Sequence, residues 1–133
     1  MKKILLLSVF AFAVSACNNQ SESNNQERKL IEDVMAVHDQ VMPKGDEVMA
    51  LKSTLDSIAK VSPDSVTALK IISELDSADN KMSDWMAAYN PDLVKGKSHE
   101  EVIKYFEGEK AKITEVKNLT NSSIEKAKKF LSK

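Results

Sequence analysis

Hydrophobic residues recur at alternating steps of three and four positions from Leu30 to Ile58, interrupted only at Lys44. This repeat constrains the fold more than any other feature. That spacing places the residues on one face of an α-helix, whereas a half-buried strand alternates every second residue. The chain of 133 residues contains only three glycines and three prolines, so few positions favour a break in a helix. The repeat therefore predicts a long helix over residues 27–60.

Pro43 and Gly45 interrupt this helical pattern. A proline inside a helix removes a hydrogen-bond donor and clashes with the preceding turn. The hydrophobic repeat keeps its phase on both sides of the interruption, which favours a helix kinked near Pro43. A break at 43–45, giving four helices in all, is the alternative.

Two further helices are indicated by their start signals. Ser62-Pro63-Asp64 is typical of a helix N-terminus and predicts a helix over 63–89. Ser98 and Glu101 have the spacing of a capping box and predict a helix over 98–131. Short connections between long helices make neighbours antiparallel. We therefore expect an all-α domain, an up-down-up antiparallel three-helix bundle with coiled-coil-like packing.

The start of the chain has the pattern of a secretory signal. Lys2 and Lys3 precede a run that is apolar apart from Ser8, and this run is shorter than the roughly 20 residues that span a bilayer. Val14-Ser15-Ala16-Cys17 then places small residues before the only cysteine. This pattern resembles the lipobox of bacterial lipoproteins. The resemblance implies that residues 1–16 are a cleaved signal peptide and that Cys17 carries the lipid.

The segment 18–26 that follows is polar and contains no aromatic residue, a composition typical of a flexible tether. We expect residues 17–26, the lipidated Cys17 with its tether, to hold a bundle domain of residues 27–133 at a membrane. In enteric bacteria an aspartate directly after the lipidated cysteine marks retention at the inner membrane. Asn18 stands there instead and favours the outer membrane by analogy, with the bundle in the cell envelope and facing the periplasm.

The least common side chains of the bundle are predicted to converge. Matching positions across the two expected turns places His38 near Trp85, Met42 near Met82 and His99 near Tyr89. The set that should gather in one half of the bundle is Met35, His38, Met42, Met82, Trp85, Met86, Tyr89 and His99.

Two interpretations of this cluster compete. In the first, the cluster is part of the core, because methionine and tryptophan fill irregular cores. His38 would then form a hydrogen bond with Asp79 or with a backbone carbonyl. Alternatively, thioethers and imidazole are ligands that suit copper(I), and methionine with histidine also ligates haem iron. The residues of the copper interpretation are His38, Met42, Met82 and Met86 as ligands, with Met35, Asp79, Trp85 and His99 around them.

Other function classes lack their signatures. The 19 basic and 20 acidic residues form no clustered basic sequence of the kind that binds nucleic acid. Neither histidine has a glutamate three residues before it, as a di-iron bundle requires, and no His-Glu-x-x-His motif is present. The sequence therefore predicts a protein that is not an enzyme and does not bind nucleic acid.

The segments Val37–Lys44 and Ala78–Met86 resemble those of small, uncharacterised bacterial lipoproteins that are sometimes labelled "viral A-type inclusion protein". That label reflects coiled-coil similarity and implies no viral function. Together with the lipobox, the resemblance implies a lipid-anchored helical protein of the cell envelope. We expect a non-enzymatic, structural or interaction role with an envelope protein as partner. Self-association remains open, and envelope copper binding is the alternative.

Overall fold

The computed structural model describes the backbone of residues 16–61 and 63–133, and the side chains of 21–61 and 63–133. Within this part of the chain all regular structure is helical, which confirms the predicted all-α class. The elements are α1 (Ala16–Val41), the 3-10 turn η1 (Met42–Lys44), α2 (Gly45–Ala59), α3 (Ser65–Ala88), the 3-10 turn η2 (Pro91–Val94) and α4 (His99–Leu131). The expected signal peptide and the Cys17 side chain lie outside the described residues.

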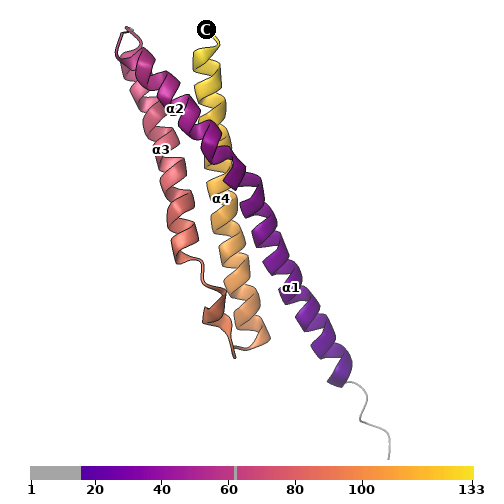
Figure 1. Cartoon of the computed structure of the whole chain (residues 1–133). Helices are drawn as coiled ribbons and strands as arrows, with labels where there is room; N and C mark the ends of the chain where they lie inside the picture. The colour runs from indigo at the N-terminus through magenta and orange to yellow at the C-terminus, as the bar shows by residue number, and fades with distance from the viewer. Residues whose placement is uncertain (1–15, 62) are drawn as a thin grey trace, which may run out of the picture.

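The first helical stretch contains a 3-10 turn at the position of Pro43. Proline has no N–H to donate, and the tighter turn η1 accommodates it between α1 and α2. The chain stays helical through the turn, because Gly45 continues directly into α2 with helical angles. In Figure 1, α1 and α2 follow one another diagonally across α4, and α3 returns beside α2.

Helix α1 begins before the expected bundle domain. Its bounds include residues 18–26, which we expected to be an irregular tether. Once a helix has formed, each added residue gains one hydrogen bond at little further cost, so a helix extends readily through exposed polar residues. The composition of this segment indicated its exposure, but it did not indicate its backbone conformation.

A series of polar pairs aligns α1 with α4. Lys110 Nζ donates to Asp33 Oδ2 at 2.7 Å, and Lys117 Nζ donates to Gln40 Oε1 at 2.9 Å. Both pairs join residues that are 77 positions apart, so α1 and α4 run in the same direction (Figure 1). Exposed pairs of this kind add little free energy to the fold. Their constant spacing nevertheless defines how the two helices are aligned.

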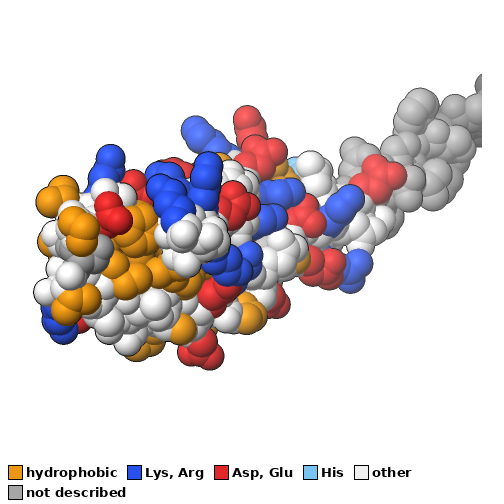
Figure 2. Space-filling model, turned by 90° about the horizontal axis from the view of Figure 1, so that it is seen from above, with side chains coloured by type: hydrophobic (Ala, Val, Ile, Leu, Met, Phe, Trp, Pro, Cys, Tyr) orange, Lys and Arg blue, Asp and Glu red, His pale blue; other side chains and the backbone are white. Residues whose placement is uncertain are grey.

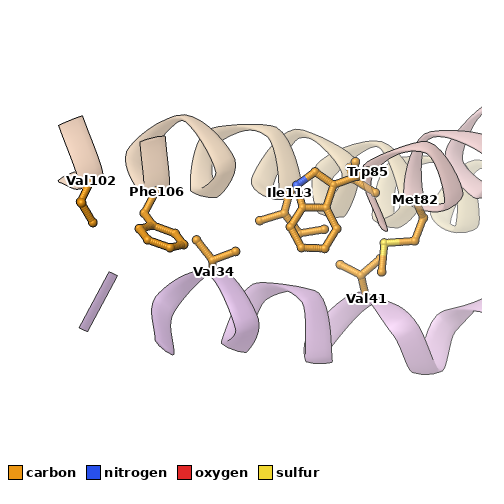
Figure 3. Close-up of a cluster of buried hydrophobic side chains, with 8 residues drawn as sticks. Val34, Val41, Met82, Trp85, Val102, Phe106 and Ile113 are labelled. Carbon is orange, nitrogen blue, oxygen red and sulfur yellow. The ribbon is translucent and has the colours of Figure 1, made fainter. Parts of the chain in front are cut away.

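Two hydrophobic clusters form the core. The first joins α1 to the end of α3 and the start of α4, and Figure 3 shows its Val34 and Val41 facing side chains of the other two helices. Its buried residues are Val34, Val41, Met82, Trp85, Val102, Phe106, Ile113 and Val116. The second joins α2 to the start of α3 and the end of α4. Its buried residues are Val48, Leu55, Ala68, Ile71, Leu75, Ile124 and Ala127.

The alignment of α3 with α4 differs from the sequence prediction. The predicted match of His99 with Tyr89 would place Trp85 level with Ile103, four residues farther along α4. Instead, Trp85 contacts Glu109, and the Tyr105 hydroxyl donates to the Asn90 carbonyl at 2.9 Å. The predicted alignment is therefore wrong by nearly two helical turns. The cause is the connection between the helices, which contains η2 and a glycine, Gly96, at φ 75°, so that α4 begins well beyond the end of α3.

The start of α4 has the predicted capping box. The Ser98 side chain accepts from the Glu101 N–H, and the Glu101 carboxylate accepts from the Ser98 N–H at 3.0 Å. The Ser98 hydroxyl also donates to this carboxylate, at 2.9 Å. The bonds from the Ser98 N–H and from the Ser98 hydroxyl lower the pKa of Glu101, the backbone bond having the larger effect. The cap fixes the first residue of α4 at His99 and so determines where this histidine lies.

Candidate functional site: a methionine-lined cavity

A cavity of about 270 Å³ opens between α3 and the junction of α1 with α2. Four of the six methionines in the chain line it, and we call it the methionine cavity. Thr120, a buried residue of α4, also lines it. The complete lining is Val41, Met42, Gly45, Asp46, Val48, Met49, Ala78, Asp79, Met82, Ser83, Met86 and Thr120.

The local sequence explains why a cavity forms here. Gly45 contributes no side chain to the wall, and no heavy atom lies within 4 Å of the position its Cβ would take. On α3, Ala78 and Ser83 are small residues beside the long Met82 side chain.

The methionines differ in how far they reach solvent. Met82 is 7% exposed and belongs to the first hydrophobic cluster, where Figure 3 shows it beside Val41. Met42 and Met86 are 46% and 41% exposed, and Met49 is 65% exposed. The cavity therefore has a buried thioether at its base and three partly exposed ones at its mouth.

The charged residues of the cavity are both acidic. Asp46 and Asp79 line it, and no lysine, arginine or histidine does. Among the described residues, neither carboxylate forms an ion pair. Two carboxylates outside the lining are paired: Asp76 with Lys52, and Glu47 with Lys128 at 2.5 Å. The mouth of the cavity thus carries uncompensated negative charge.

The structure brings together part of the predicted site. Met42, Met82 and Met86 line the same cavity, and Asp79 lies beside them. Met35 is 36% exposed on α1 and is not part of the lining.

His38 lies outside the cavity. Its Nδ1 is 2.9 Å from Asp39 Oδ1, so its carboxylate partner is Asp39, whereas Asp79 or a backbone carbonyl was the expected partner. The ring centroids of His38 and Trp85 are 5.7 Å apart, in agreement with the predicted match of these two residues across the first turn between helices. Tyr89 stacks on Trp85, with ring centroids 4.9 Å apart.

His99 does not join the other predicted residues. Its Nδ1 is 2.7 Å from Glu27 Oε1 on α1, at the end of the bundle beyond Tyr89. The prediction that it gathers with the methionines is wrong. The cause is the connection between α3 and α4, which lets α4 begin farther beyond the end of α3 than a short turn would.

Sequence reasoning missed a buried acid, Glu109. This residue is 5% exposed, accepts from Trp85 Nε1 at 3.0 Å and pairs with Lys112 Nζ at 2.7 Å. It lies at helical spacing between the buried Phe106 and Ile113, so the hydrophobic repeat of α4 would have revealed a carboxylate on the core face. Burial, with Tyr105 and Glu109 nearby, raises the pKa of the Tyr89 phenol.

A second apolar surface lies at the end of the molecule opposite the start of α1. Figure 2 shows hydrophobic side chains gathered there with lysines beside them. Val61, Val66 and Leu69, around the α2–α3 connection, are 86%, 78% and 55% exposed. Exposed apolar groups that adjoin one another are typical of contact surfaces.

Within the described ranges, no three or more His, Cys, Asp or Glu side chains gather as a metal site would require. Over the same residues, no helix combines the length and the apolar character needed to cross a bilayer. Comparison of the chain with protein-family models, with curated proteins and with solved structures finds no match.

Proposed function

We propose that this protein is a lipid-anchored helical protein of the bacterial cell envelope that acts by binding another protein and catalyses no reaction. The observation that carries the binding role is the methionine cavity, where three partly exposed methionines surround a buried one. Methionine is flexible and polarizable, and it is common on surfaces that adapt to different partners. An apolar cavity left open to solvent has a cost in water that a bound partner would remove.

The anchor rests on the residues at the start of the chain. Val14-Ser15-Ala16-Cys17 resembles a lipobox, so cleavage after Ala16 would leave Cys17 as the lipidated N-terminus. One acyl chain gives only marginal membrane binding, whereas the several chains of a bacterial lipoprotein give a stable anchor. Asn18 favours the outer membrane, with the bundle facing the periplasm.

The bundle is proposed to be of the up-down-up type with coiled-coil-like packing and a kink near Pro43. The α1–α4 pairs support this packing, because Asp33 and Gln40 are one heptad apart and have partners one heptad apart. The 3-10 turn η1 supports a change of helix direction at Pro43.

A single substitution tests the anchor. In cells supplied with a labelled fatty acid, the wild-type protein is expected to take up label and to sediment with membranes. Cys17→Ala removes the sulfur that accepts the lipid, so the variant should lose both properties, and Ser23→Ala should lose neither. Labelling of the Cys17→Ala variant, or an unlabelled wild-type protein, would overturn the proposed anchor.

Copper(I) binding is the second candidate function, and the shared cavity of Met42, Met82 and Met86 favours it. The imidazole of His38 does not line that cavity, so the candidate ligands are thioethers, the softest neutral donors in proteins. Leucine matches methionine in volume and removes the sulfur, which makes Met→Leu a suitable substitution.

The test is a titration of residues 18–133 with copper(I) in competition with a chelator. This fragment keeps all the described buried residues, which lie between Val34 and Ala127. Copper(I) should bind more tightly than about 1 μM, and Met42→Leu with Met86→Leu should abolish that binding. His38→Ala should leave it unchanged. Binding no tighter than micromolar in the wild-type fragment excludes this candidate.

A further inference from the structure

We propose that the methionine cavity binds a basic amphipathic helix of a partner protein. One large apolar side chain of that helix enters the cavity, and its lysine or arginine residues lie beside Asp46 and Asp79. This inference rests on the proposed binding function and names the chemistry of the partner.

The size of the cavity fits a side chain. A dry cavity of about 150 Å³ is enough to hold benzene. The methionine cavity, at about 270 Å³, therefore accommodates a phenylalanine or leucine side chain. A single ion bound by thioethers would leave most of this volume unfilled.

The walls of the cavity have the spacing of a helix-binding groove. Met42 and Met49 are seven positions apart along one wall, which corresponds to roughly 10 Å of helix. Met82 and Met86 are one turn apart on the facing wall. A helix that docks in a groove uses apolar residues at steps of three, four and seven, and these spacings match that pattern.

The charge of the cavity selects among such helices. Asp46 and Asp79 are exposed and lack ion-pair partners in the described part of the chain, and no cation lines the cavity. An acidic helix would place like charges together, whereas a basic helix would supply the missing partners. Attraction of this kind favours the correct partner and weakens as salt is added.

The probe is a synthetic peptide of about 14 residues, leucine on one helical face and lysine on the other. The control peptide replaces every lysine with glutamate. Residues 18–133 are labelled at the methionine methyl groups, and peptide binding is followed by nuclear magnetic resonance. Met35 lies outside the cavity and serves as the internal reference.

The lysine peptide is expected to shift the methyl signals of Met42, Met49, Met82 and Met86 and to leave that of Met35 in place. The glutamate peptide should bind at least about tenfold more weakly. Equal binding of the two peptides, or shifts no larger than that of Met35, would overturn the proposal. Cavity signals that move with protein concentration alone would also overturn it, because a second copy would then be the occupant.

Charge reversal supplies an independent test. Asp46→Lys with Asp79→Lys changes two exposed residues of the cavity. This double variant should bind the lysine peptide at least about tenfold more weakly than the wild type. Glu107→Lys with Glu125→Lys makes the same change of net charge at exposed positions outside the cavity. This control variant should lose much less affinity for the lysine peptide. An equal loss of affinity in both double variants would show that the peptide responds only to net charge, and it would contradict a specific site.

These outcomes are separate from the test of the anchor. The fragment lacks Cys17, so the fatty-acid experiment and the peptide experiment can each fail alone. If only the peptide-binding experiment fails, a basic helix is rejected as the partner, and the proposed lipid anchor is unaffected.

Discussion

Glu109 shows how a single polar residue is accommodated in this core. Each of its carboxylate oxygens has a partner, Trp85 Nε1 for one and Lys112 Nζ for the other. An unpaired buried carboxylate would cost far more free energy than the paired one. The Lys112 side chain is 64% exposed, so the ion pair links the buried tryptophan to the surface.

Truncation of Glu109 tests this arrangement. Glu109→Ala leaves the indole N–H of Trp85 without its partner and opens space in the core, so the free energy of unfolding should fall by about 2–3 kcal/mol. Glu109→Gln keeps an acceptor and should cost less. Unfolding in urea, followed by the fluorescence of the single tryptophan, measures both. A loss no greater than that of Glu107→Ala, at an exposed position, would show that the contact contributes little.

The capping carboxylate predicts how stability depends on acid pH. The Ser98 bonds hold the pKa of Glu101 below its ordinary value of 4.5. As pH falls through 4.5, the unfolded chain takes up this proton before the folded chain does, and stability decreases. The contribution is complete above the ordinary pKa and is lost as pH falls through the folded-state pKa. Glu101→Gln should therefore flatten the pH profile of the unfolding temperature in this range, and an unchanged profile would contradict the cap.

At the scale of elements, the sequence predicts helices well and their connections poorly. The expected helices 63–89 and 98–131 correspond to α3 (Ser65–Ala88) and α4 (His99–Leu131). Pro91 marks the end of α3 locally and the Ser98 capping box marks the start of α4, whereas α3 begins two residues later than expected, at Ser65. The alignment across the second connection could not be counted from residue numbers. The turn η2 and Gly96 determine how far α4 starts beyond α3, and this distance depends on backbone angles that the sequence does not specify.

Substitution of two glycines tests the backbone conformation of α4 and of the connection before it. Gly108 lies inside α4 with open space around its Cβ position, so Gly108→Ala should raise the free energy of unfolding by about 0.5–1 kcal/mol. Gly96 has φ 75°, where an alanine is strained, so Gly96→Ala should lower the free energy of unfolding by about 1 kcal/mol. Denaturation in urea compares the two. Effects of the same sign would show that the connection before α4 has a different conformation.

At the scale of the molecule, the candidate site depends on how the helices are rotated. Counting residues placed Met42 and Met82 at one level, and both do line one cavity. It also grouped His38 with them. His38 does lie against Trp85, as counted, but its Nδ1 pairs with Asp39 and its side chain does not line the cavity. The direction of a side chain depends on the rotation of its helix about its own axis, which a heptad pattern defines only approximately.

The central claim is that a bundle held at a membrane by Cys17 binds a partner through the methionine cavity. Flotation of neutral phosphatidylcholine vesicles that carry the lipidated protein tests it directly. The lysine peptide should float with wild-type vesicles and with Glu107→Lys/Glu125→Lys vesicles, and it should remain at the bottom with Asp46→Lys/Asp79→Lys vesicles. Equal flotation with all three, or none with the wild type, would contradict the account.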